Sequence, residues 1–119
     1  MGTTHADHLA IDIPCTPVMS DEMIKGDYEH ETGNQILNYF ESHQLDYQEV
    51  EMVLISNHGP FTWGNSPDKA VYNSAVLEEL AEMACLSLQI NPDAPPLKRA
   101  LIQKHYERKH GKDAYYGQK

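Results

Sequence analysis

The sequence has few cysteines, little positive charge and no long apolar run. Its two cysteines, Cys15 and Cys85, stand alone without CxxC spacing, which favours a reducing cytosol over a disulfide framework. No apolar run approaches the ~20 residues that cross a bilayer, and the first residues lack the basic-then-apolar pattern of a signal peptide. We therefore expect a cytoplasmic protein that does not bind membranes.

Positive charge is scarce and unevenly placed. Nine Lys and Arg face eighteen Asp and Glu, for a net charge of −9, which argues against nucleic-acid binding. From Lys98 onward there are seven basic and two acidic residues (net +5), and the rest of the chain carries −14. The basic segment is either a solvated helix, or a helix that docks on an acidic neighbouring subunit or attracts a phosphorylated substrate.

The first half of the chain has the patterns of a strand and a helix. Alternation through residues 8–14 predicts a strand that ends at a proline. Ser20 is a good N-cap and is followed by two acids, so we expect a helix from there towards Phe40. Gly26 and Gly33 weaken that helix, and either is a place for a bend.

The second half predicts two strands and two helices. Residues 52–56 form an apolar run typical of a buried strand, and a Gly-Pro turn separates it from a second strand at 61–63. Ser66 and a following proline begin a helix, whose stripe we expect to pack on the sheet. The stripe consists of Leu77, Leu80, Ala81, Ala84 and Leu88. A proline-rich linker (91–96) leads to a last helix (97–110) ended by Gly111. The class is mixed α/β in one domain over 1–119.

Three segments carry residues with useful chemistry. His58 follows the buried strand, where a histidine is either a hydrogen-bonded structural residue or a metal ligand. On a strand, His5 and Asp7 would share one face, which by spacing alone is a weak metal motif. His105 and His110 lie about 140° apart around a helix, so they cannot chelate a metal together and are expected at the surface or as caps.

These segments resemble a known family. The motifs GTTHAD (2–7), NHGPFTWG (57–64) and KHYERKHG (104–111), with the tyrosine pair at 115–116, resemble the C-terminal half of the L-ribulose-5-phosphate 4-epimerases, which are zinc enzymes of the class II aldolase/adducin family. The resemblance extends from Gly2 to Gln118. It implies a class II aldolase-like three-layer α/β/α fold with a mostly antiparallel sheet, of which this chain would be a truncated C-terminal half.

The resemblance also implies roles for individual residues. The histidine at the position of His58 is a zinc ligand in that family, and His105 would lie near the active site. Asp7 and Tyr116 would be acid/base groups on opposite faces of the substrate, with Tyr116 contributed by a neighbouring subunit of a cyclic tetramer. The implied reaction on a pentulose phosphate is retro-aldol cleavage and re-addition with inversion at C4, with Zn²⁺ as the Lewis acid. For Tyr116, the alternative is aromatic packing that holds the C-terminus.

Other parts of the family's site have no counterpart here. Its first two zinc ligands form a His-x-His pair upstream of this region, and its phosphate-binding loops also lie upstream. No His-x-His pair occurs in this sequence, and a catalytic zinc normally has three protein ligands. We therefore expect this chain alone to be inactive, and to need a homo-oligomer or a separate upstream half to cover the surfaces that the upstream elements would bury.

Three hypotheses follow from the sequence. The first is a sugar-phosphate epimerase fragment that becomes competent when an upstream segment complements it. The second is a non-catalytic oligomeric assembly or binding module of the adducin type. The third is a small metal-binding protein built on His5, Asp7 and His58.

Overall fold

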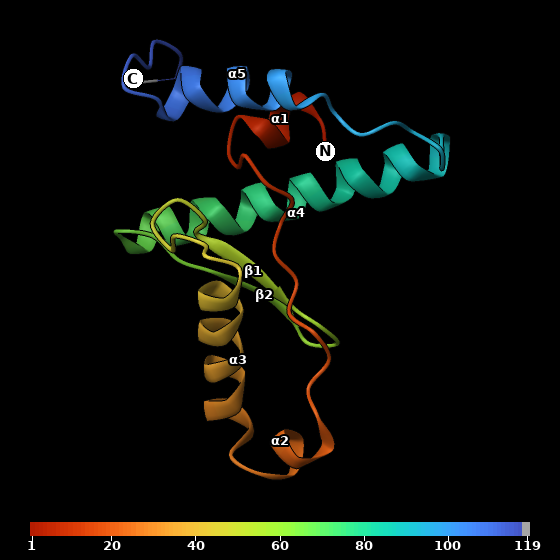
Figure 1. Ribbon diagram of the computed structural model, residues 1–119, viewed down its shortest axis with the longest axis vertical. Coiled ribbons are helices and arrows are strands. Elements are labelled where there is room, and N and C mark those ends of the chain that lie inside the picture. The colour runs from red at the N-terminus through yellow and green to blue at the C-terminus, as the bar shows by residue number, and fades with distance from the viewer. Residues whose placement is uncertain (118–119) are drawn as a thin grey trace. The chain divides into compact units, whose positions relative to one another are not determined.

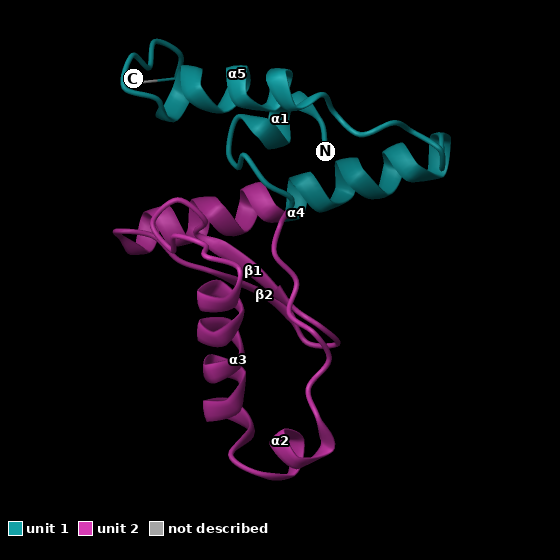
Figure 2. Cartoon of the chain, in the orientation of Figure 1, with its two compact units in different colours: residues 1–12, 78–119 teal, residues 13–77 magenta. Residues whose placement is uncertain are grey.

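The chain divides into two compact units (Figure 2), and each is described by itself. The computed structural model describes residues 1–117. Unit 2 comprises residues 13–77, and unit 1 comprises residues 1–12 together with the chain from residue 78 onward. The elements, labelled in Figure 1, are α1 (Thr3–Ala6), α2 (Asp21–Lys25), α3 (Tyr28–Ser42), β1 (Met52–Ile55), β2 (Gly59–Thr62), α4 (Pro67–Ile90) and α5 (Arg99–His110).

Unit 2 contains the two helices predicted as one. The Ser20 side chain accepts a hydrogen bond from the Met23 N–H at 3.3 Å and caps α2, as the sequence predicts. The helix ends at Gly26, whose backbone leaves the helical region, and α3 begins two residues later. Gly33 lies inside α3 without interrupting it. Of the two predicted bends, the one at Gly26 is therefore confirmed.

The two strands of unit 2 form an antiparallel hairpin. Met52 of β1 pairs with Thr62 of β2, and Ile55 pairs with Gly59. The expected Gly-Pro turn is wrong, because Gly59 and Pro60 belong to β2 and residues 56–58 make the turn. Asn57 supplies the left-handed backbone that the turn requires, with φ of 60°. His58 therefore lies in the turn itself, one residue before the second strand.

The hydrophobic core of unit 2 is built around β1. Val53 is fully buried, and Leu54 is the one residue of the strand that is only half-buried. This agrees with the apolar run that predicted a strand covered on both faces. The other buried apolar residues of the unit are Met19, Phe40, Val50, Met52, Ile55 and Leu77.

Helix α4 begins as predicted but is buried over a shorter stretch. The Ser66 hydroxyl accepts from the Lys69 N–H at 3.1 Å and caps the helix. Leu77 and Leu80 are buried, but the expected continuation of the packed stripe is wrong, because Ala81, Ala84 and Leu88 are exposed. Within residues 1–117, no helix is long and apolar enough to cross a membrane.

The strand predicted over residues 8–14 does not form. The chain turns after α1, and pairing with the hairpin is limited to one isolated parallel bridge between Cys15 and Leu54. Its two hydrogen bonds are Leu54 N–H to Pro14 O at 2.8 Å and Thr16 N–H to Leu54 O at 2.9 Å. An alternating pattern needs a strand partner over its length, and β1 is bridged only to Cys15, the residue after this segment.

Unit 1 brings the beginning of the chain onto its last helix. Helix α1 packs against α5. Residues 3–6 are helical, so the strand on which His5 and Asp7 would share one face does not form. The last helix forms as predicted and ends at His110, with the Gly111 N–H bonded to the Glu107 carbonyl at 2.7 Å. Residues 91–98 before it contain no helix or strand, as expected of the linker.

Candidate functional site

Asp7 is the centre of a cluster of charged and polar side chains in unit 1. It is the C-cap residue of α1, and the packing of α1 on α5 places its carboxylate against the basic face of that helix. The side chain is 13% exposed. A carboxylate this well covered is costly to bury unless positive or hydrogen-bonding groups surround it.

Three side chains of α5 surround the Asp7 carboxylate. Arg108 makes a two-pronged contact, with Nε at 3.1 Å and one terminal nitrogen at 2.9 Å from Oδ1, and that same nitrogen at 3.0 Å from Oδ2. His105 Nδ1 lies 2.9 Å from Oδ1. Lys109 Nζ lies 3.9 Å from Oδ2. Residues 105, 108 and 109 share one helix face because of the three- and four-residue spacing.

The cluster determines the charge of Asp7. Burial alone would raise the pKa of the carboxyl, but hydrogen bonds from His105 and Arg108 and the charge of Lys109 outweigh burial, so the pKa is lowered from its ordinary value. Asp7 is therefore a carboxylate at neutral pH, with Arg108 as its principal counter-ion. A carboxylate only accepts hydrogen bonds, so the proton between the two side chains belongs to Nδ1 of His105.

This arrangement defines the chemistry that the cluster can perform. A neutral His105 with its proton on Nδ1 has a lone pair on Nε2, which can accept a proton or bind a metal. Asp7 fixes that tautomer and the orientation of the His105 ring, as the carboxylate does in many carboxylate–histidine pairs. The Asp7–His105 pair can therefore take up a proton at Nε2 of His105 and release it again.

Tyr116 meets the same arginine from the tail. Its ring centroid lies 4.2 Å from Cζ of Arg108 and 5.5 Å from Nζ of Lys109. The backbone N–H groups of Tyr115 and Tyr116 both donate to the Arg108 carbonyl, at 3.0 and 3.1 Å. Tyr116 remains 51% exposed. The three predicted catalytic residues thus lie in one cluster: Arg108 contacts Asp7 and Tyr116, and His105 contacts Asp7.

Two other histidines of unit 1, His110 and His5, hydrogen-bond to backbone carbonyls. His110 Nε2 donates to the Asp7 carbonyl at 3.0 Å, and its ring stacks on Tyr106 with centroids 4.6 Å apart. His5 Nε2 donates to the Ile11 carbonyl at 2.9 Å. Burial lowers the pKa of His5 against the opposing effects of that hydrogen bond and of Asp12. A metal site on His5 and Asp7 gains no support, because these groups are already bonded elsewhere.

His58, the predicted metal ligand, belongs to unit 2. It is exposed in the hairpin turn, and its ring lies beside two aromatic side chains: Phe61, with centroids 5.6 Å apart, and Tyr28, at 6.2 Å. Among residues 1–117, no group of three or more His, Cys, Asp or Glu side chains could hold a metal ion. The described donors therefore do not form a metal site on their own, and a metal at His58 would need ligands from elsewhere.

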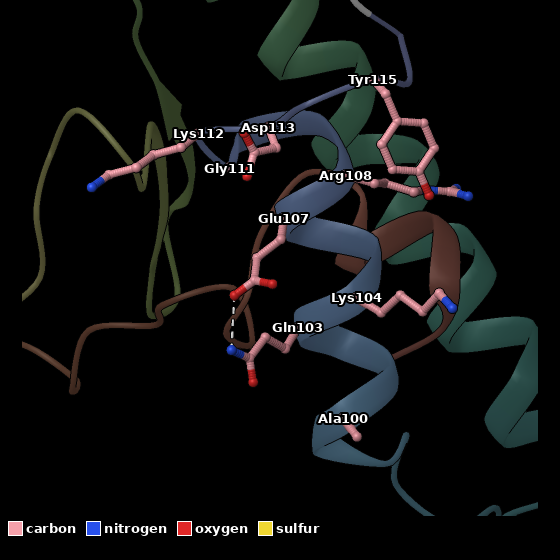
Figure 3. Close-up of a pocket in the computed structure, with 9 residues that line it drawn as sticks. All are labelled: Ala100, Gln103, Lys104, Glu107, Arg108, Gly111, Lys112, Asp113 and Tyr115. Carbon is pink, nitrogen blue, oxygen red and sulfur yellow. Dashed lines mark hydrogen bonds between the residues drawn. The ribbon is translucent and has the colours of Figure 1, made fainter.

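A groove of about 640 Å³ runs along α5 and the turn that follows it. Figure 3 shows Lys104 and Lys112 pointing in opposite directions. Glu107 and Asp113 also line the groove, and Glu107 accepts a hydrogen bond from Gln103 at 2.8 Å. The positive charges do not converge on one point, so the groove itself is not a built anion site. The basic segment instead supplies the side chains that hold Asp7.

Arg108 is the residue that the sequence interpretation missed. It had a signal, because it lies three residues after His105 and so shares its helix face. The resemblance had already placed Asp7 and His105 in one site. A carboxylate there requires a counter-ion, and Arg108 is suitably spaced to provide it.

Comparison with known proteins agrees with the motifs. Residues 1–85 match the model of the class II aldolase and adducin N-terminal domain. The chain is 48% identical over 119 residues to a Mycoplasma pneumoniae protein named probable L-ribulose-5-phosphate 4-epimerase UlaF, with 99% of this chain and 49% of the relative covered. It is 43% identical over 119 residues to L-ribulose-5-phosphate 4-epimerase UlaF of Salmonella paratyphi C, with 100% of this chain and 51% of the relative covered. The chain thus spans about half the length of these relatives, and it belongs to the class II aldolase and adducin family.

Proposed function

We propose that this chain contributes the proton-transfer part of an L-ribulose-5-phosphate 4-epimerase and is inactive by itself. Its identity to relatives that bear this name, over the whole of its own length, carries the proposal. The clustering of Asp7, His105 and Tyr116 supports it, because an inversion through bond cleavage needs two proton-transfer groups. The adducin-type alternative is not favoured, since the relatives reported above bear epimerase names.

In this proposal each residue has a defined role on a pentulose phosphate. One of Asp7 and Tyr116 removes the proton from the C4 hydroxyl as the C3–C4 bond breaks. After the aldehyde rotates and the C3–C4 bond re-forms on its other face, the other residue donates a proton to the C4 oxygen. His105 orients Asp7 through the hydrogen bond that its Nδ1 donates, and its Nε2 can take up a proton from the other side of the ring. Asp7 and Tyr116 of one chain contact the same guanidinium. This supports both residues serving the site from one subunit, whereas the resemblance has Tyr116 contributed by a neighbouring subunit.

The metal of the proposed enzyme is zinc, with His58 as the one ligand from this chain. Since the described residues hold no metal on their own, the other ligands would come from a segment equivalent to the family's upstream half. That segment would complete the three-layer α/β/α fold, of which residues 1–119 would be one part. The subunits would then form a homo-oligomer, the cyclic tetramer of the family, in pentose and arabinose metabolism of the cytoplasm.

The exposed end of α4 supports a missing covering element. Leu86 and Ile90, four residues apart on one face of this helix, are 49% and 85% exposed. Large apolar side chains grouped on one element are usually buried by a partner. The upstream half or a neighbouring subunit would supply that cover.

Complementation tests the proposal. The chain is mixed with the half of the Salmonella relative that it does not cover, and epimerase activity and bound zinc are measured before and after mixing. We expect activity and about one zinc per chain only in the mixture. The His58→Ala variant should lose zinc and activity, Asp7→Asn should keep zinc and lose activity, and His30→Ala, an exposed position on α3, should change neither. A zinc-loaded mixture without activity would refute the function, and zinc retained by His58→Ala would refute the ligand.

A further inference from the structure

One guanidinium contacts both candidate proton-transfer residues. The in-plane N–H groups of Arg108 point at Asp7, and the ring of Tyr116 lies against the guanidinium, centred 4.2 Å from Cζ. An arginine can make both contacts at once, because its donors lie in the plane and aromatic rings bind its face. Arg108 itself is only 23% exposed at its side chain.

We propose that Arg108 is a positioning residue that couples the charge of Asp7 to the docking of Tyr116. Its catalytic meaning rests on the proposed function, whereas the coupling is a property of this chain alone. The proposal adds a residue to the site and states how that residue acts on the two others.

The physical basis is mutual support around one cation. When the Tyr116 ring covers Arg108 it excludes water, and an ion pair is stronger in a less polar surrounding. When Asp7 is ionised, it fixes the guanidinium of Arg108 in one plane, so the face on which the Tyr116 ring packs is already oriented. A coupling between two events is reciprocal. Protonation of Asp7 therefore favours release of Tyr116 from Arg108, and release of Tyr116 makes Asp7 easier to protonate.

The other groups facing Asp7 cannot replace Arg108. Lys109 is farther from both partners, at 3.9 Å from Oδ2 and 5.5 Å from the ring centroid of Tyr116. His105 bonds Oδ1 alone, and His110 bonds the backbone carbonyl of Asp7 rather than the carboxylate. Of these groups, Arg108 is the one that spans the carboxylate and the tail at short distance.

Direct titration of the carboxylate tests the first half of the proposal. The side-chain carbon signal of Asp7 is followed by nuclear magnetic resonance against pH in the wild-type chain and in Arg108→Met, Arg108→Lys and Arg99→Met. Arg99 is an exposed arginine in the first turn of the same helix. We expect the Asp7 midpoint to move to higher pH in Arg108→Met. In Arg108→Lys it should lie between the wild-type and Arg108→Met values, because lysine keeps the charge but cannot make the two-pronged contact. A midpoint in Arg108→Met equal to that in Arg99→Met would overturn the proposal.

The tail provides an independent test that leaves Arg108 intact. Tyr116→Leu should raise the Asp7 midpoint more than Tyr115→Leu does, because Tyr115 is 74% exposed and its ring is not the one centred near Cζ of Arg108. Equal midpoints in the two variants would refute the coupling. Neither test needs substrate, metal or an upstream half. If the Asp7 midpoint shifts in these variants but the complemented enzyme is inactive, the coupling stands and the proposed function is rejected. If the complemented enzyme is active but the midpoint does not shift, the proposed function stands and the coupling is rejected.

Discussion

Replacement of Asp7 by asparagine measures how strongly the polar cluster stabilises the fold. The change keeps the size of the side chain and removes its charge, leaving Arg108 without its counter-ion. Exposed ion pairs contribute at most about 1 kcal/mol, and breaking a fully buried pair costs about 3–5 kcal/mol. With Asp7 at 13% and Arg108 at 23% side-chain exposure, we expect Asp7→Asn to lower the free energy of unfolding by about 2 kcal/mol at pH 7.

The pH dependence of that loss has a definite sign. The pKa of Asp7 is lowered in the folded chain from its ordinary value of 3.8. A lowered pKa gives stability that is fully present above the ordinary value and is lost as the pH falls through the folded value. The wild-type chain should therefore be more stable than Asp7→Asn at pH 7 and at pH 5, and the difference should narrow below pH 3.8 as the wild-type carboxylate itself becomes neutral.

Urea unfolding followed by circular dichroism measures this difference across the pH range. Asp93→Asn is the matched control, because Asp93 is exposed in the linker before α5, and we expect it to change stability by less than about 0.5 kcal/mol. Two results would refute the reasoning: no destabilisation of Asp7→Asn at pH 7, or a loss that stays constant down to pH 3. The second would mean that the asparagine perturbs packing rather than charge.

Two further predictions concern unit 2, and urea unfolding measures both. Gly33→Ala should stabilise the chain by up to about 1 kcal/mol, since its new Cβ meets nothing within 4 Å inside α3. Gly64→Ala should lower the free energy of unfolding by about 1–3 kcal/mol, since its Cβ would lie 2.8 Å from Cβ of Lys69. Equal changes in stability from the two glycine substitutions would contradict this. Val53→Ala should cost about 2–3 kcal/mol, because Val53 is fully buried in β1. Val18→Ala, at a 64% exposed position, should cost less than about 0.5 kcal/mol, and a Val53 variant as stable as this control would be inconsistent with a packed β1.

Local signals in the sequence predicted most of the elements. Ser20 and Ser66 each marked a helix start through a side-chain cap, and Gly111 marked a helix end. The apolar run at 52–56 correctly predicted a buried strand. These features succeed because each depends on residues within one or two turns of chain, where hydrogen bonding and spacing are set by neighbours.

Features that depend on distant residues could not be predicted in the same way. The alternation at 8–14 satisfies the pattern of a strand, but the bridge to β1 lies at Cys15, one residue beyond that segment. The four residues of α1 are too few to show helical periodicity. The ion pair of the candidate site joins residues 101 positions apart. Here the resemblance to a family supplied what spacing could not: it predicted one site for Asp7, His105 and Tyr116, and in the structure Asp7 and Tyr116 contact the same arginine.

The shared arginine also constrains how this part of the sequence can evolve. A substitution at Arg108 alone would leave Asp7 buried without its main counter-ion, and a substitution at Asp7 alone would leave a covered cation. Each single change passes through a less stable chain, so the two positions should be retained together or lost together among descendants of this lineage. Tyr116 contacts the same arginine from an exposed position. Under the proposed function, it should be the first of the three to be substituted once catalysis no longer selects for it. The order in which these three residues are substituted in a lineage would then indicate whether it lost the proposed activity before it lost the fold.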